Sequence, residues 1–250
     1  MSKKSKTKKN KPYLIGAGVA VVATLAGLAS YTATRPGPSV AVEQQAEERA
    51  EQQVAAYPEL EKYARRDAAD PLAIGRADAP VVMIEYADFA CGYCGKFARD
   101  IEPALIEKYV DAGVLRIEWR NFPIFGEESE RVARASWAAG QQGRFWPFHR
   151  AAYAEGAKER GFAKDRLLAL AREAGVPDLD RFGRDVDSAA ARAAVAADQE
   201  QGWSLGASST PSFLVNGRPI AGAQPMETFA SAIESARESA RESARREAAK

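Results

Sequence analysis

The chain has 250 residues, of which 46% are hydrophobic, and a formal net charge of +1. Six of its 35 basic side chains lie in the first twelve residues, which leaves 29 basic against 34 acidic side chains, a net charge of −5, in the rest. This length accommodates one domain of ordinary size with additional segments. The acidic balance of the larger part excludes a function based on electrostatic binding of nucleic acid.

The amino-terminal residues predict a membrane anchor. Residues 1–12 are basic, and residues 12–34 contain no charged side chain. At about 1.5 Å per residue, a helix of this length spans the roughly 30 Å hydrocarbon core of a bilayer. Lysines on its amino side keep that end in the cytoplasm. We therefore predict a cytoplasmic segment (1–12), a single transmembrane helix (13–34) and an extracytoplasmic domain held at the cell membrane.

A cleaved signal peptide is the alternative, because Gly27-Leu28-Ala29 offers a cleavage site. In both cases the larger part of the chain is exported to an oxidising environment. Residues 35–69, which are rich in Glu, Gln and Ala after a Pro-Gly-Pro break, predict a linker or stalk. One domain follows over 70–232, and the Ser-Ala-Arg-Glu repeat predicts a charged, solvated helical tail over 233–250.

The domain begins with a strand, a helix and a second strand. The apolar, β-branched run at 81–86 predicts a buried strand, and the alternation of apolar and charged residues at 114–119 predicts another. Between them, a helix should begin at the cysteines and run towards Val110 with a kink at Pro103.

A helical region then separates these strands from a hairpin. The Ala-, Arg- and Glu-rich sequence over about 125–205 predicts an inserted block of helices, and a strand at 212–215 with the turn Asn216-Gly217 predicts the hairpin. A last helix should start near Pro225. The block should be broken close to three glycines: Gly143, Gly161 and Gly175. This order predicts an α/β or α+β domain and excludes a helical bundle.

The two cysteines of the chain form one Cys91-Gly92-Tyr93-Cys94 motif. A disulfide that closes so short a loop constrains the unfolded chain little, so the pair suits redox chemistry better than structural cross-linking. A thiol that follows a strand and opens a helix has its thiolate stabilised by the helix dipole and main-chain N–H groups. We therefore predict that Cys91 is the more exposed nucleophile and Cys94 the buried resolving thiol.

Metal binding is the alternative use of such a pair. A closed zinc site needs four ligands, and the chain adds one histidine, His149, to its two cysteines. Capture of a soft ion such as Cu(I) stays open. We expect no bound metal and no cofactor, and we expect His149 to be a buried packing residue.

Three segments resemble the DsbA-like thioredoxin-fold thiol:disulfide oxidoreductases. They are residues 78–94, which contain the cysteines, residues 206–217 around Thr210-Pro211, and Phe145-Trp146-Pro147-Phe148-His149. The resemblance covers about residues 70–232, and the anchored form is similar to membrane-tethered actinobacterial members. It implies an α/β, thioredoxin-like fold with an inserted helical domain, preceded by one transmembrane helix.

The resemblance also implies roles for single residues. Cys91 and Cys94 match the redox pair, and Pro211 matches a cis-proline that lies against the disulfide. Thr210 matches the residue whose backbone pairs with a bound peptide. An ordinary turn into a strand is the alternative reading of Thr210-Pro211.

Two more residues complete the predicted site. Glu85 matches an acidic position beneath the cysteines that exchanges protons with Cys94. The alternative interpretation is that Glu85 is a solvated glutamate at the edge of the sheet. Tyr93, in the middle of the motif, is a substrate-binding candidate. Family members often have Pro or His at the two middle positions, where this chain has Gly92 and Tyr93, which leaves the oxidising strength open.

The predicted function is exchange of disulfides with exported proteins that carry free thiols, with disulfide donation as the leading direction. A membrane oxidase would re-oxidise the Cys91-Cys94 pair. A reductase or isomerase on the same fold is the first alternative, because direction depends on reduction potential and partner. A copper-binding or chaperone-like module on a thioredoxin fold is the second.

Overall fold

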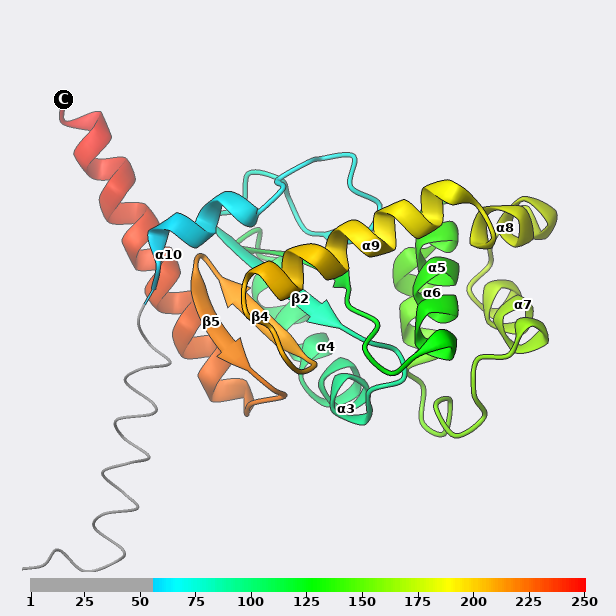
Figure 1. Cartoon of the computed structure of the whole chain (residues 1–250). Helices are drawn as coiled ribbons and strands as arrows, with labels where there is room; N and C mark the ends of the chain where they lie inside the picture. Colours follow the sequence, from blue (N-terminus) through cyan, green and yellow to red (C-terminus); the bar gives the residue numbers. More distant parts are fainter. Residues whose placement is uncertain (1–55) are drawn as a thin grey trace, which may run out of the picture. The chain divides into compact units, whose positions relative to one another are not determined.

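A computed structural model describes residues 56–250, which contain a five-stranded mixed sheet (Figure 1). The strand order is β1-β3-β2-β4-β5. The two central strands β2 and β3 are parallel, and every other neighbouring pair is antiparallel. The strands span Ala73–Ile74 (β1), Val81–Ala87 (β2), Leu115–Asn121 (β3), Ser212–Val215 (β4) and Arg218–Ala221 (β5).

Helices cover the two faces of the sheet and form a separate block beside it. The 3-10 helix η1 comes first, and the π-helical turn η2 ends the segment that joins β2 to β3. The bounds are Pro58–Tyr63 (η1), Gly92–Asp100 (α3), Glu102–Leu105 (α4), Ile106–Val110 (η2), Glu127–Gly140 (α5), Phe145–Ala152 (α6), Lys164–Glu173 (α7), Leu179–Val186 (α8), Ala189–Ser204 (α9) and Met226–Ala248 (α10).

The central strand β2 is buried on both faces, which explains its continuous apolar sequence. Val81 and Met83 pack with Phe97 of α3 and with residues of α10 on one face. Ile84 and its neighbours on the other face pack against residues of η1 and of the segment that follows α9. The parallel strands β2 and β3 both end where the cysteines begin, so this end of the sheet carries the site.

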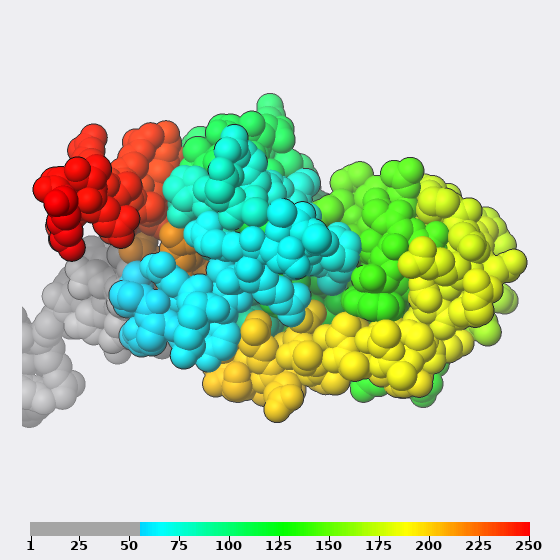
Figure 2. All heavy atoms as spheres, turned by 90° about the horizontal axis from the view of Figure 1, so that it is seen from above, coloured from blue at the N-terminus to red at the C-terminus, as the bar shows by residue number. Residues whose placement is uncertain are grey.

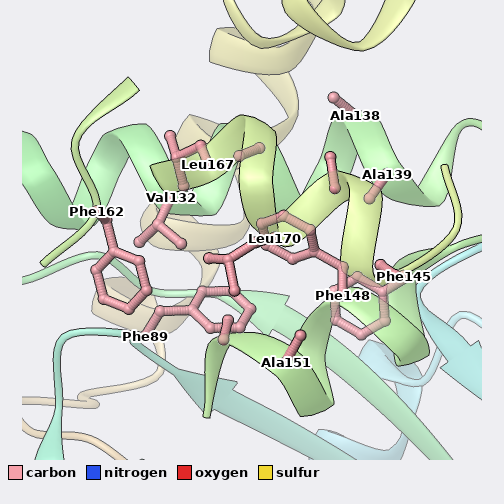
Figure 3. Packing of buried hydrophobic residues seen from close by; sticks show 14 of the residues in the cluster. Phe89, Val132, Ala138, Ala139, Phe145, Phe148, Ala151, Phe162, Leu167 and Leu170 are labelled. Carbon is pink, nitrogen blue, oxygen red and sulfur yellow. The ribbon is translucent and has the colours of Figure 1, made fainter. Parts of the chain in front are cut away.

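The helical block has a core of its own. Helices α5 to α8 pack around aromatic and aliphatic side chains, and α9 runs from this block back along the sheet (Figures 1 and 2). Phe89, from the turn just before the cysteines, points into this cluster beside Phe148 (Figure 3), with ring centroids 6.3 Å apart. The segment that carries Phe89 and the two cysteines is therefore anchored in the helical block as well as in the sheet.

Most predicted elements of the domain are confirmed. The three strands lie within two residues of their expected positions, and the hairpin turns at Asn216-Gly217. The helix after the cysteines breaks at Ile101, because Pro103 removes an N–H donor and clashes with the preceding turn. β1, η1 and the break before α9 were not predicted. At that break the Ser188 hydroxyl accepts a hydrogen bond from the Ala191 N–H at 3.0 Å.

Two boundaries differ from prediction. Residues 57–69 do not project as a stalk, because main-chain N–H groups of Arg65 and Arg66 bind the buried Glu118 carboxylate. At the other end, α10 continues through the expected border, and Ile233 and Ala236 are buried in the core of the domain rather than in a solvated tail.

The predicted membrane helix over 13–34 lies outside the described residues. None of the helices in residues 56–250 combines the length and the apolar character that crossing a bilayer requires.

Candidate redox site

The cysteines lie at the junction of β2 and α3. Cys91 is the N-cap of α3, with extended backbone angles, and its carbonyl accepts the Gly95 N–H at 3.1 Å. Cys94 lies one turn into the helix and is completely buried. Cys91 is more exposed than Cys94, as predicted, but only 5% of its surface is accessible.

Asp88 fixes the turn that presents Cys91, a role that the sequence analysis missed. Its carboxylate accepts hydrogen bonds from the Ala90 N–H at 2.8 Å and the Ile124 N–H at 2.7 Å, and from the Ser129 hydroxyl. These bonds tie the turn to the segment after β3 and to α5. A local sequence signal for this role exists, because an Asp in a turn often accepts a hydrogen bond from the main-chain N–H of the second residue after it.

The two thiols differ in acidity. A hydrogen bond from Cys94 lowers the pKa of Cys91 to about 6 against the opposing effect of burial, and the Thr210 side chain and nearby main-chain N–H groups add to this. Burial raises the pKa of Cys94 well above its ordinary value, and its hydrogen bond to Cys91 adds to the rise. At neutral pH the pair therefore holds one thiolate, on Cys91, and one thiol, on Cys94.

The segment before β4 closes over Cys91. The Thr210–Pro211 peptide bond is cis, as the resemblance implied. The Cys91 thiol lies 3.3 Å from the Thr210 carbonyl oxygen, to which it donates when protonated. Tyr93, the other predicted substrate-binding residue, lies within the motif and is 70% exposed. The structure thus brings Thr210 and Pro211 to the cysteines although more than one hundred residues separate them in the chain.

A cavity of about 400 Å³ opens beside Cys91. Phe89 and Tyr153 form part of its apolar lining, and Arg99 and Lys158 contribute charged groups. The Arg99 guanidinium is held by a hydrogen bond to the Tyr153 carbonyl oxygen at 2.8 Å. The cavity therefore offers both apolar surface and charge next to the nucleophile.

Glu85 lies beneath the pair, in the middle of β2 between Trp119 of β3 and Phe213 of β4. It is completely buried, so the alternative of a solvated edge residue is wrong. Neither of its carboxylate oxygens has a hydrogen-bond partner among residues 56–250. Burial, and to a lesser extent the charge of the nearby Glu102, raises the pKa of Glu85 well above its ordinary value, so the site favours the neutral form of this side chain.

His149 is buried, as predicted, and lies on α6 among aromatic rings. The ring centroids of Trp119 and Trp146 lie 5.0 and 5.2 Å from it. In the described part of the chain, no three His, Cys, Asp or Glu side chains gather in a way that would hold a metal ion.

This geometry agrees with the comparison of the chain with known families. The sequence profile of the family described as thioredoxin matches residues 67–235. The chain belongs to this family. It is 32% identical over 150 residues to a protein named probable disulfide bond formation protein D of Bacillus cereus, a match that covers 58% of this chain and 69% of that relative.

Two solved structures have the same fold as this chain. BdbD from Bacillus subtilis superposes with a TM-score of 0.63 at 22% identity, over 68% of this chain and 94% of BdbD, which shows the shared fold. A thioredoxin-like oxidoreductase from Silicibacter pomeroyi has a TM-score of 0.59 at 31% identity, over 69% and 94% of the two chains. The predicted membership in the DsbA-like family of protein disulfide oxidoreductases is confirmed.

A further relative is much longer than this chain. The chain is 36% identical over 163 residues to the Na(+)/H(+) antiporter NhaA 3 of Salinispora tropica. The match covers 64% of this chain and 24% of the antiporter, so the chain spans about a quarter of that relative's length.

Proposed function

We propose that this thioredoxin-family protein oxidises thiols of exported proteins through the Cys91-Cys94 pair. The observation that carries the proposal is the asymmetry of the two thiols. Cys91 is an acidic thiol at a helix start, next to the Thr210-Pro211 segment, and Cys94 is a buried thiol that resists ionisation. In such a pair, Cys91 forms the mixed disulfide with a client and later leaves it, and Cys94 resolves that mixed disulfide.

The exchange runs in two steps. A client thiolate attacks Cys91 Sγ of the Cys91–Cys94 disulfide, and a client–Cys91 disulfide forms as the bond to Cys94 breaks. The Cys94 thiolate then takes a proton, for which Glu85 is the adjacent donor. A second client thiolate attacks the client sulfur, Cys91 leaves as its stable thiolate, and two electrons have passed from the client to the pair.

The acidity of Cys91 favours disulfide donation over reduction. A stabilised Cys91 thiolate stabilises the reduced protein, which makes the disulfide form a better oxidant. The cavity beside Cys91 supports a role in binding client side chains, with Thr210 and Tyr93 as neighbouring contacts. Pro211, beside Thr210, keeps its expected role in shaping this surface.

Equilibration of the protein with glutathione buffers tests the direction. We expect a reduction potential on the oxidising side of about −200 mV, between the values of about −270 mV for thioredoxin and about −120 mV for DsbA. A potential near that of thioredoxin would instead favour the reductase alternative. A pair that does not exchange with glutathione would contradict the oxidoreductase proposal altogether.

The proposed location is the outer side of the cell membrane, with the chain anchored through residues 13–34. The support for it is the uncharged stretch that follows the basic residues 1–12. The proposed partners are exported proteins with free thiols and a membrane oxidase that restores the disulfide. Protease added to intact protoplasts should digest residues 56–250, whereas protection of this part would contradict export. Release of a shortened soluble form would indicate signal cleavage.

A further inference from the structure

Two positively charged side chains lie against the first turn of α3. The turn has glycines at positions 92 and 95, which are three residues apart and therefore on the same side of the helix. A Cβ atom on Gly95 would lie 2.8 Å from Nη1 of Arg99, and one on Gly92 would lie 3.5 Å from Nζ of Lys158. The absence of side chains on this side leaves the place next to the N-cap cysteine to the guanidinium and the ammonium group.

Both cations line the cavity beside Cys91. Its volume of about 400 Å³ lies in the range of about 300–1,000 Å³ that is usual for small-molecule sites. Arg99 is fixed by its hydrogen bond to the Tyr153 carbonyl oxygen, and Lys158 comes from the segment between α6 and α7. Among residues 56–250, neither cation forms an ion pair.

The same cavity has two exposed carboxylates in its lining, Glu155 and Glu159. Within the described part of the chain, these glutamates also have no ion-pair partner. Charges of both signs are therefore available to a ligand. An anion would be repelled by the glutamates, and a cation by Arg99 and Lys158, so the lining is complementary to a ligand that carries both charges.

The nucleophile in the lining defines which such ligand can react. Cys91 exchanges with sulfur, so a ligand that reacts in this cavity must contain a disulfide bond. We propose that the cavity binds a small disulfide with a carboxylate and an ammonium group next to its sulfur, of which cystine is the simplest probe. Arg99 and Lys158 bind the carboxylate. Glu155 and Glu159 bind the ammonium group.

The reaction would restore the disulfide of the reduced protein. The Cys91 thiolate attacks one sulfur of the small disulfide RSSR, one RS⁻ leaves, and a mixed disulfide of Cys91 with RS forms. Cys94 then gives up its proton and attacks Cys91 Sγ, and the second RS⁻ leaves. One released thiolate takes the Cys94 proton, and two electrons have passed from the pair to RSSR. The inference rests on the proposed exchange through Cys91-Cys94 and adds a small-molecule oxidant to it.

Four small disulfides with different charges test the proposal. Cystine carries both charges, dithiodipropionate only carboxylates, cystamine only ammonium groups, and hydroxyethyl disulfide neither. Each oxidises the reduced full-length protein at pH 7, and mass spectrometry after acid quenching follows the formation of the Cys91–Cys94 disulfide. Because every compound is compared between wild type and a variant, the reactivity of its own leaving thiolate cancels.

Two variants should have complementary effects. Lys158→Gln should slow oxidation by cystine and by dithiodipropionate about fivefold, as expected for the loss of one partly exposed ion pair, and should not slow the other two. Glu155→Gln combined with Glu159→Gln should slow cystine and cystamine and not the other two. Cystine alone responds to both variants. A change in the acidity of Cys91 would slow hydroxyethyl disulfide as well, so this compound is the internal control.

Lys96 offers a matched control variant on the same helix. It forms an exposed ion pair with Asp100 at 2.7 Å and does not line the cavity. Lys96→Gln should therefore react with all four disulfides at the wild-type rates. Equal rates for wild type, Lys158→Gln and the double glutamate variant with cystine would overturn the proposal.

Two further comparisons locate a failure. If none of the four disulfides oxidises the wild-type pair, the proposed function fails. If all four do and neither variant distinguishes them, only the charged cavity is refuted. A disulfide-linked peptide with Lys and Glu on the two sides of its cysteine carries the same charges on a larger frame. If both variants slow this peptide as much as cystine, the ligand is a client protein, and the proposal of a small disulfide is overturned.

A measurement on wild type decides the matter even if the variants do not fold. Raising the salt concentration from 10 mM to 500 mM screens charges that are partly exposed. We expect the rate with dithiodipropionate to fall relative to that with hydroxyethyl disulfide, because Arg99 and Lys158 attract its carboxylates. Repulsion by the Cys91 thiolate alone would have the opposite sign. A relative rate that is constant or rises with salt would overturn the proposal.

Discussion

Two neighbouring strands each carry a completely buried glutamate, and the two have opposite surroundings. Glu118 of β3 accepts hydrogen bonds from the main-chain N–H groups of Arg65 and Arg66, at 2.8 and 2.7 Å, and from two arginine side chains of its own strand. Burial opposes ionisation, yet these donors lower the pKa of Glu118 below its ordinary value. Glu85 of β2 has no such donor in the described chain.

The comparison shows that burial alone does not set the role of an acidic residue. With four donors, Glu118 is a permanent anion that fastens residues 65–66 to the sheet. Without them, Glu85 favours its protonated form, as the proposed transfer of a proton to the Cys94 thiolate requires. A group that changes charge during a reaction needs surroundings that tolerate both forms, whereas a structural ion needs saturated hydrogen bonds.

The substitution Glu118→Gln should have a large effect on stability, because it removes the buried anion of β3. It leaves the buried Arg116 and Arg120 without their common counter-charge. We expect a loss of about 3–5 kcal/mol in the free energy of unfolding, measured by urea denaturation. The exposed ion pair of Glu127 with Arg131 offers the control, since Glu127→Gln should change stability by less than about 1 kcal/mol.

The acidity of Cys91 should survive in the folded fraction of Glu118→Gln. A loss below about 1 kcal/mol in the free energy of unfolding would show that the hydrogen bonds of Glu118 contribute little to stability and that Glu118 is not a structural anion.

Glu85→Gln should have the opposite profile, with a large effect on rate and no loss of stability. Below the ordinary glutamate pKa it replaces a neutral acid by a neutral amide of similar shape, so the free energy of unfolding should there stay within about 1 kcal/mol of the wild-type value. Oxidation of a dithiol peptide should slow by about 100-fold, because Cys94 must then leave as an unprotonated, poor leaving group. Alkylation of Cys91 serves as the internal control and should not change.

The pH dependence of stability sharpens this prediction. The folded protein binds the Glu85 proton more tightly than the unfolded chain, so wild type loses stability as pH rises above the ordinary glutamate pKa. Relative to wild type, Glu85→Gln should therefore gain stability as pH rises above the ordinary glutamate pKa, by at most about 1.4 kcal/mol per pH unit. A difference that is independent of pH would show that Glu85 is ionised in the folded protein.

A smaller effect is expected at Thr210. Its buried hydroxyl has no hydrogen-bond partner among residues 56–250, which leaves it available to the Cys91 thiolate, and the Thr210 side chain lowers the pKa of Cys91. Thr210→Val keeps the shape and removes the donor, so the pKa of Cys91 should rise. Alkylation of Cys91 at pH 6 should slow by about threefold, in line with the modest worth of one hydrogen bond. Thr210→Ser, which keeps the hydroxyl, should react at close to the wild-type rate. Equal rates for Thr210→Val and Thr210→Ser would show that the Thr210 hydroxyl does not lower the pKa of Cys91.

The sequence predicted features that depend on neighbouring residues. The strand at 81–86, the helix that opens at Cys91, its break before Pro103 and the hairpin at Asn216-Gly217 all follow from local patterns of hydrophobicity and backbone preference. The likeness of the segments around Cys91 and Pro211 to known family members then predicted that these distant segments form one site.

Features made by long-range pairs were not predicted. Arg65 binds Glu118 across 53 positions, so residues that read as a stalk belong to the domain. Glu102 likewise reads as an ordinary charged residue at a helix start, and its buried setting depends on packing against His149 of the inserted helices. Asp88 joins its own turn to the segment after β3 and to α5, and only its bond within the turn could be predicted from neighbouring residues.

The reduced pair should hold one acidic thiol, Cys91, and one that resists ionisation, Cys94. Titration of the thiolate ultraviolet absorbance in the reduced protein measures both ionisations. We predict a single step near pH 6 that is lost in Cys91→Ser, and no second step between pH 7 and pH 9, where Cys94 stays protonated. Two thiols that ionise together near the ordinary cysteine pKa would contradict the account.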